Sequence, residues 1–195
     1  SGVSDCSRGV FAGGNTPPRI DTIEFVSISV SGNATDFAGE LTQEALQRKG
    51  GHSNGSRGVY TGGSPPVRDH IEYITIGTLG DSTDFGELFV ATAYFASISD
   101  GSRAITGGGD PNIDTIQYFN MASLGSSSDF GELSESRHSA GGVTNGSRGV
   151  IAGGYDTAIL DTQDYITIGT LGNATDSQEL TQARELYNFG NLSGD

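Results

Sequence analysis

The chain has 195 residues and a formal net charge of −14 at pH 7. This acidic balance argues against binding to the phosphate backbone of nucleic acids and against adhesion to an anionic membrane. Cys6 is the only cysteine, so an internal disulfide is excluded and a structural zinc site has no support. No stretch of the sequence is apolar and long enough to be inserted into a bilayer.

One motif recurs four times along the chain: a serine and an arginine, a short apolar run, and a glycine pair. The copies lie about 45–50 residues apart, a period typical of one propeller blade. The sequence therefore predicts an all-β, four-bladed β-propeller made of four-stranded antiparallel blades. The predicted units of this single domain are residues 1–41, 42–88, 89–133 and 134–180.

Each unit is expected to begin with a hairpin. Asn54-Gly55, Asp100-Gly101 and Asn145-Gly146 separate apolar runs. They predict a type I′ turn, in which both central residues have positive φ. The second strand then ends at the glycine pair, and a variable loop leads to a third strand with a partly alternating pattern of apolar residues. Asp-Phe-Gly-Glu-Leu at 84–88 and 129–133 is expected to form the outer strand, with altered copies at 36–41 and 176–180.

The two ends of the chain predict a closed ring. The first unit is expected to lack a first strand of its own, and Glu185–Gly190 matches that place in the pattern. We therefore expect residues 181–195 to complete the first blade by antiparallel pairing with Arg8–Ala12. The same strand could instead complete a blade of a neighbouring chain and build a fibre. A chain that starts inside a repeat is also expected to be an excised or processed part of something longer.

The apolar strand ending in Gly-Gly, followed by a loop and a Glu-Tyr strand, resembles a kelch repeat over the full chain. More closely, it is similar to glycine-rich kelch-like repeats of virion structural and tail-fibre-like proteins of marine tailed phages. The chain departs from the kelch pattern in having no tryptophan, with Phe37, Phe85 and Phe130 in the outer half of the repeat. The resemblance implies a role at a virion surface or another extracellular site, and it transfers no catalytic residue.

Residues that recur once per blade are interpreted as structural, because a catalytic or metal site needs a local constellation. We expect arginine–aspartate contacts within or between blades, and glycine pairs that no side chain can replace. These structural residues are Arg8, Arg57, Arg103 and Arg148, Asp21, Asp69, Asp114 and Asp161, and Gly14, Gly63, Gly109 and Gly154. No cofactor is expected. The Asn/Asp-rich turns before the outer strands leave calcium as an alternative, although capping of the turns explains the same residues.

The loop between the second and third strands varies most among the units, and recognition on rigid scaffolds is often carried by such loops. Aromatic and arginine side chains dominate binding hot spots. Arg19, Arg68 and Tyr155 are therefore the predicted contact residues.

The leading functional hypothesis is a non-enzymatic structural or adhesive module of a virus particle or an extracellular fibre. Its expected partners are other copies of itself, other particle proteins or a cell-surface glycan. A carbohydrate-binding propeller is the second hypothesis, and it would predict one aromatic and polar pocket per blade. A polysaccharide-acting enzyme is the third, and it would need acidic residues and a histidine to converge at one mouth of the channel.

Overall fold

The computed structural model describes residues 1–15, 19–42, 50–186 and 192–193. Within these ranges the regular structure is entirely β, and it forms four sheets of four consecutive antiparallel strands. The expectation of four antiparallel four-stranded units is confirmed. No helix in the described part of the chain has the length and apolar character needed to cross a membrane.

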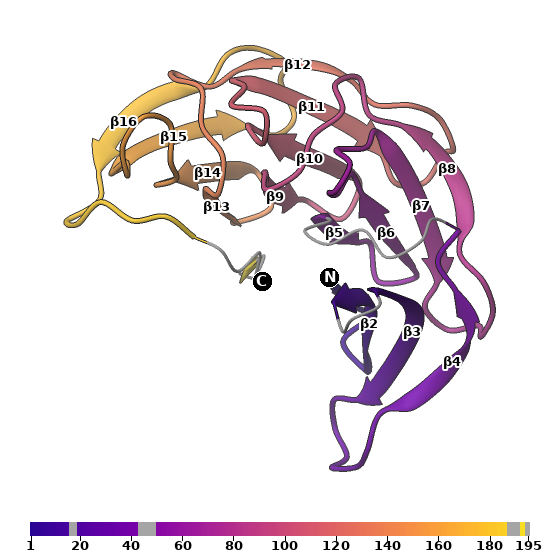
Figure 1. Ribbon diagram of the computed structural model, residues 1–195. Coiled ribbons are helices and arrows are strands. Elements are labelled where there is room, and N and C mark those ends of the chain that lie inside the picture. Colours follow the sequence, from indigo (N-terminus) through magenta and orange to yellow (C-terminus); the bar gives the residue numbers. More distant parts are fainter. Residues whose placement is uncertain (16–18, 43–49, 187–191, 194–195) are drawn as a thin grey trace.

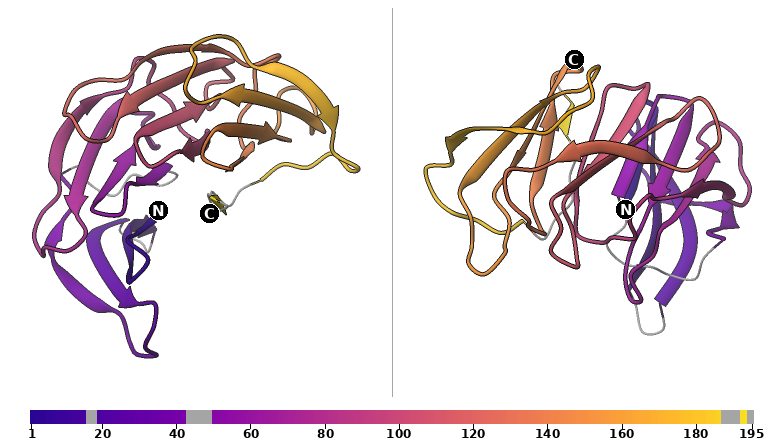
Figure 2. Two further views of the ribbon diagram at one scale, coloured as in Figure 1. Left: turned by 180° about the vertical axis from the view of Figure 1, so that it is seen from behind. Right: turned by 90° about the horizontal axis from the view of Figure 1, so that it is seen from above.

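The sheets stand side by side along an arc in a propeller-like arrangement, with the first and the fourth sheet at its two ends (Figures 1 and 2). Each sheet runs in chain order from an inner strand to an outer strand. The first sheet contains β1 (Gly2–Ser4), β2 (Arg8–Asn15), β3 (Arg19–Ser27) and β4 (Thr35–Glu40); the second contains β5 (Gly50–Ser53), β6 (Arg57–Thr61), β7 (His70–Thr75) and β8 (Thr83–Glu87). The third contains β9 (Ala96–Ser99), β10 (Arg103–Gly107), β11 (Thr115–Asn120) and β12 (Ser128–Glu132); the fourth contains β13 (Gly141–Thr144), β14 (Arg148–Ala152), β15 (Thr162–Thr167) and β16 (Thr175–Glu179). A short further strand, β17 (Leu192–Ser193), pairs in parallel with β13.

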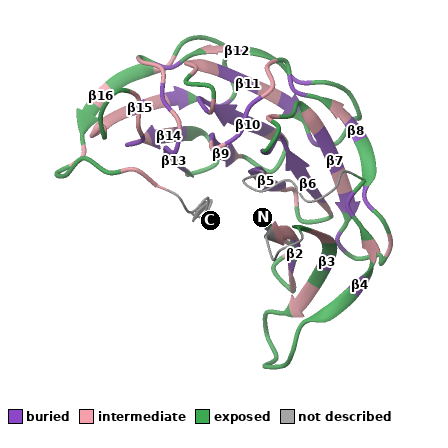
Figure 3. Cartoon of the chain, viewed as in Figure 1, coloured by how far each residue is buried: buried purple, intermediate pink, exposed green. Residues whose placement is uncertain are grey.

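The hydrophobic core lies between neighbouring sheets, in three separate clusters. Each cluster joins one face of a sheet to the opposite face of the next sheet. Ile23 and Phe37 of the first sheet, for example, pack with Tyr60 and Ile76 of the second. The inner and middle strands of the second and third sheets are accordingly more buried than the outer strands, which are largely exposed (Figure 3). Stacking of sheets therefore supplies most of the buried apolar area.

The first strand of the first sheet corrects the predicted closure. β1 pairs antiparallel with β2, with Val3 opposite Val10, so the first sheet has its own inner strand. The expectation that it lacks one, and that Arg8–Ala12 needs residues 181–195 as a partner, is wrong. Within Glu185–Gly190 only Glu185 and Leu186 are described, and Leu186 donates its N–H to the carbonyl of Ser139 in the linker before the fourth sheet. The sequence signal of β1 was weak because only three residues form it.

The predicted hairpins are present, but their turns are not of type I′. Gly55 has a φ of 83°, whereas Asn54 before it does not have a positive φ. The Asn54 side chain instead accepts hydrogen bonds at Oδ1 from the backbone N–H of Ser56 (3.1 Å) and of Arg57 (2.8 Å). The equivalent aspartate or asparagine does the same in the other three sheets. This side-chain cap explains why Asx, Ser and Arg recur at fixed spacing.

Cys6 is the one departure from glycine at the left-handed position of these turns, with a φ of 71°. A residue with a Cβ atom costs about 1 kcal/mol in this conformation. We expect Cys6→Gly to raise the free energy of unfolding by about 0.5–1 kcal/mol in urea titrations, since the side chain is exposed and makes no core contact. An unchanged or lower stability would show that the turn is not strained at Cys6.

The glycine pairs mark where the chain after each outer strand crosses beneath the second strand. Gly62 has a φ of 60°, and a Cβ atom added there would lie 2.3 Å from the carbonyl oxygen of Thr92. The N–H of Gly63 donates to that same oxygen at 3.1 Å. The same crossing recurs at Gly108 with Arg137 and at Gly153 with Arg184. The residues that follow the outer strand of the first sheet in the sequence, 43–49, lie outside the described part of the chain.

We expect Gly62→Val to lower the free energy of unfolding by about 1–3 kcal/mol, because the side chain would strain φ and push against backbone. Gly55→Val is the matched control for backbone strain alone, since Gly55 also has a positive φ but a Cβ atom there would meet no other atom within 4 Å. Chemical denaturation of both variants checks the difference. Equal losses at the two glycines would contradict the crowding of Gly62 by Thr92.

Candidate binding surface

The repeated arginines bind the neighbouring sheet and not the predicted aspartates. Arg8, Arg57 and Arg103 each donate from Nη1 to a backbone carbonyl of the next sheet, at distances between 2.6 and 3.1 Å. Each guanidinium also lies over an aromatic ring of its own sheet, 4.5–4.9 Å from the ring centroid. Arg148 of the last sheet lies over Tyr165 at 3.6 Å and is exposed. The structural role predicted for these arginines therefore rests on carbonyl and cation–π contacts.

The repeated aspartates contribute through their backbone. The carbonyl of Asp21 accepts a hydrogen bond from the N–H of Leu41 at 2.9 Å, which fixes the end of the outer strand against the start of the third strand. Asp69, Asp114 and Asp161 accept from Leu88, Leu133 and Leu180 in the same way. These contacts hold each outer strand in place.

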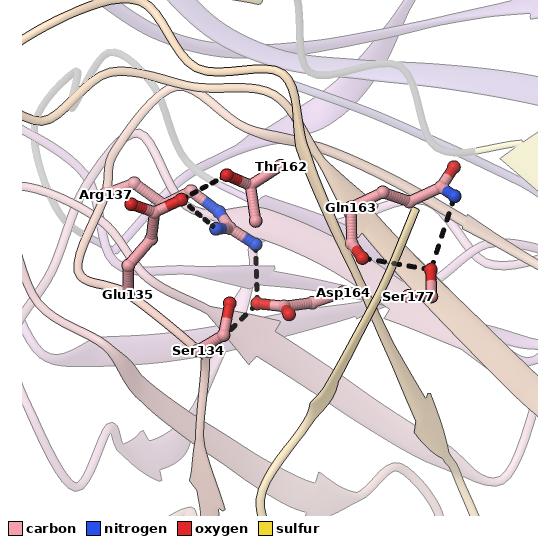
Figure 4. A network of polar contacts seen from close by, with 7 residues as sticks. All are labelled: Ser134, Glu135, Arg137, Thr162, Gln163, Asp164 and Ser177. Carbon is pink, nitrogen blue, oxygen red and sulfur yellow. Dashed lines mark hydrogen bonds and ion pairs between the residues drawn. The ribbon is translucent and has the colours of Figure 1, made fainter. Parts of the chain in front are cut away.

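Sequence reasoning missed a second repeated group, a polar side chain in the middle of the third strand. Asp164 is fully buried, accepts from the N–H of Ser134 (3.0 Å) and pairs with Arg137 Nη2 at 2.7 Å (Figure 4). Glu72 and Gln117 occupy the same place in the second and third sheets, and they accept from the N–H of Thr42 and Val90. Each of these residues therefore binds the linker that arrives from the preceding sheet. The missed signal is a polar residue at the same position of every third strand.

The Asn/Asp-rich turns before the outer strands also serve packing between sheets. The side chains of Asp81, Ser126 and Asn173 each accept a hydrogen bond from a backbone N–H of the preceding sheet's outer strand, at 3.0–3.2 Å. In the described part of the chain no group of three histidine, cysteine or acidic side chains is placed to hold a metal ion. The geometry gives these turn oxygens protein partners, which explains their recurrence without calcium.

The variable loops and the linkers between sheets share one edge of the arc, which we call the loop rim. The backbone of Ala93 in one linker forms an isolated antiparallel β-bridge with Asp110 of the third loop. His138 of the next linker forms the same kind of bridge with Tyr155 of the fourth loop. Neighbouring loops also touch, since Asn112 donates to the side chain of Asp156 at 2.7 Å. The rim is thus a continuous surface carried by all the sheets.

The three predicted contact residues all lie on the loop rim. Arg19 is exposed and donates from Nη1 to the carbonyl of Pro65 in the next loop, at 3.0 Å. Arg68 is exposed, and its backbone is held by Gly63 and Thr92. Tyr155 is half-buried in the fourth loop, so the structure brings the first two loops together but places Tyr155 apart from them.

Tyr155 belongs to a small aromatic group that sequence reasoning did not identify. Its ring centroid lies 5.5 Å from that of His138, and His138 lies 5.9 Å from Tyr94. The carboxylate of Glu185 is 3.8 Å from His138 Nδ1. The four residues come from two linkers, a loop and the segment after β16, so the spacing along the chain gave no sign of the group. Its neighbouring tilted rings and carboxylate offer the kind of surface that binds sugars or cationic side chains.

A hollow with a volume of about 990 Å³ opens on the inner side of the arc. The inner strands and their turns line it, and its apolar part includes Phe11, Val26 and Ile28 of the first sheet together with Ile98.

No family model matches the chain, and no curated protein matches it either.

Proposed function

We propose that this chain is a non-enzymatic structural or adhesive module in which stacked sheets form a rigid frame and the loop rim makes the contacts with a partner. The observation that carries the proposal is that residues at repeated positions and residues at variable positions make contacts in different places. Residues at the repeated arginine position and at the polar position of the third strand, such as Arg57 and Gln117, join sheet to sheet. Those that differ between units, such as Arg68 and Tyr155, gather on one rim.

The proposed setting is the surface of a virus particle or an extracellular fibre, and the proposed partners are particle proteins or a cell-surface glycan. This setting follows from the resemblance of the repeat and not from the geometry. In place of the closed four-bladed ring expected from the sequence, we propose an open arc as the frame, because the first sheet already holds its own inner strand.

Carbohydrate binding is the second candidate, and the aromatic group around His138 favours it. Aromatic rings beside a carboxylate can hold a sugar ring, because they offer an apolar face on one side and hydrogen-bond acceptors on the other. The group occurs once in the described residues and not once per sheet, which supports a single glycan site over a repeated one.

Binding of the full chain to an array of bacterial and cell-surface glycans, and to purified particle proteins, tests both candidates. We expect the double variant Arg68→Ala, Tyr155→Ala to lose about tenfold or more in affinity if the rim carries the contacts. Leu124→Ala is the control, because Leu124 is an exposed apolar residue in the turn between β11 and β12, away from the loops. Equal affinity of the double variant and the wild type would refute the rim, and polysaccharide cleavage by the wild type would refute a non-enzymatic role.

A further inference from the structure

The three contacts between neighbouring sheets follow one design. Each sheet has a forward face, directed at the next sheet along the chain, and a backward face, directed at the preceding one. The forward faces of the first three sheets contribute one apolar residue each from the second, third and outer strands: Val10, Ile23 and Phe37; Val59, Ile71 and Phe85; Ile105, Ile116 and Phe130. The backward faces that cover them contribute Ile74 and Ile76, Phe119 and Met121, and Ile166 and Ile168.

At two of the three contacts the inner strand of one sheet fits a side chain over a glycine of the next sheet, whereas Ala104 occupies this place in the third sheet. A Cβ atom on Gly58 would lie 2.5 Å from Val3 of the preceding sheet, and one on Gly149 would lie 2.2 Å from Ile98. At Gly9 of the first sheet the nearest atom to such a Cβ is Val26 Cγ2, at 3.5 Å and within the same sheet. The first sheet therefore has an open place over Gly9, which we call the socket at Gly9. No side chain of the described residues of another sheet fills this socket.

The rest of the first sheet's backward face is built in the same way and is exposed. Phe11 is 55% exposed and Ile28 is 56% exposed, whereas their counterparts Tyr60 and Ile76 are fully buried. Glu24 is exposed too, and it occupies the position at which Glu72, Gln117 and Asp164 bind the linker of a preceding sheet. The apolar patch of Phe11 and Ile28 and the carboxylate of Glu24 thus occupy the same positions as the contact residues on the backward faces of the other sheets. Exposed apolar patches of this kind mark interaction surfaces.

The forward face of the fourth sheet does not match this backward face. Gln163 and Ser177 replace the buried isoleucine and phenylalanine, and Ser177 donates to the carbonyl of Gln163 at 3.0 Å (Figure 4). Gln178 replaces a glycine whose Cβ, at Gly86 and Gly131, would lie only 2.4–2.6 Å from backbone of the next sheet. A polar hollow of about 700 Å³ lies beside these residues. Terminal units of stacked-repeat proteins carry polar outer faces of this kind.

We propose that the backward face of the first sheet is a docking surface for a further sheet of this same repeat, one that bears the apolar forward face of the first three sheets. The occupant fills the socket at Gly9 with an aliphatic side chain of its inner strand and covers Phe11, Val26 and Ile28. Its linker donates an N–H to Glu24. The polar face of the fourth sheet is excluded as the occupant, because Gln163, Ser177 and Gln178 would be pressed against apolar side chains and backbone. This proposal does not depend on what the loop rim binds.

The test extends the full chain at its N-terminus with a second copy of one of its own units. A copy of residues 96–140 supplies the third sheet, with an apolar forward face, and the linker containing Ser134 and Arg137. A copy of residues 141–185 is the matched control, because it has the same length and supplies the polar face of the fourth sheet. Phe11→Trp serves as the reporter in both, since the chain has no tryptophan of its own.

In the chain extended with the copy of residues 96–140, we expect the indole at position 11 to emit at shorter wavelength and to resist quenching by acrylamide. In the chain extended with the copy of residues 141–185, acrylamide should quench the indole as strongly as in the unextended chain. Glu24→Arg in the first of these chains should restore quenching, because it would set a second cation against the copied Arg137. Equal quenching in both extended chains would overturn the proposal. Protection of the indole in the unextended chain that rises with protein concentration would also overturn it, by showing that a second copy of the chain covers this face.

Discussion

Replacing Asp164 by alanine is expected to lower the free energy of unfolding by about 3–5 kcal/mol, because it leaves the Arg137 guanidinium buried without its anion. Both side chains are fully buried, and Nη2 of Arg137 lies 2.7 Å from Oδ2 of Asp164. Glu135 is 3.4 Å from the other guanidinium nitrogen, Nη1, but is itself partly exposed. The variant also removes the acceptor for the N–H of Ser134. Equilibrium unfolding in urea measures the loss.

Two further variants separate charge from packing. Gln117→Ala removes the same linker contact from the third sheet, where no buried ion pair is involved, and should cost about 1–3 kcal/mol. The double variant Arg137→Thr, Asp164→Gln copies the third sheet, in which Thr92 and Gln117 occupy these places. It should recover most of the loss, since no charge remains unpaired. A loss below about 1 kcal/mol for Asp164→Ala would contradict a coupled buried pair.

Acid is expected to destabilise the chain through His52, in the pH range between about 6.5 and 4. Burial lowers the pKa of His52 from 6.5 to about 4, because the ring lies between the second and third sheets, 5.6 Å from Phe119. As the pH falls through this range, the unfolded chain takes up a proton that the folded chain does not. The contribution of His52 to the free energy of unfolding should therefore fall by about 3 kcal/mol across the range and stay constant below it.

The substitution His52→Ile tests this assignment, because Val3 and Ile98 occupy the same place in the first and third sheets. The difference in unfolding free energy between the wild type and the variant should change with pH between 6.5 and 4 and stay constant above 7. Ile98→Val is the packing control, since it removes a methylene without changing any titrating group. A pH profile for His52→Ile that runs parallel to that of the wild type would show that another group carries the acid sensitivity.

Local structure followed from the sequence wherever a residue acts on its own neighbours. The Asx-Gly pairs predicted the hairpins because the capping side chain and the glycine that must adopt a positive φ are adjacent. Glycine pairs such as Gly62-Gly63 were also identified as structural, since only glycine fits a positive φ against a crossing backbone. The turn type was predicted wrongly because the side chain of Asn54 caps the turn without adopting a positive φ itself.

Contacts between sheets were harder to predict. The acceptor of Arg57 is the backbone carbonyl of Met121. Every residue has such a carbonyl, so the residue type gives no sign that it is the acceptor. The aspartates were predicted as partners because the same acidic residue recurs in every unit. The buried polar residues of the third strands were missed because they differ in type from sheet to sheet. The loop rim could be predicted from sequence variation, but the grouping of Tyr94, His138 and Tyr155 depends on how linkers cross the rim.

The repeated residues act by holding each sheet to the next, and three of the repeated arginines test this role most directly. Unfolding free energies of Arg57→Ala, Arg103→Ala and Arg148→Ala should be measured under identical conditions. The first two should each cost about 1.5–3 kcal/mol, since each loses a charged hydrogen bond to the next sheet as well as a ring contact. Arg148 of the last sheet keeps only its ring contact in the described structure, so its loss should stay below about 1 kcal/mol. Equal losses at all three arginines would contradict this role.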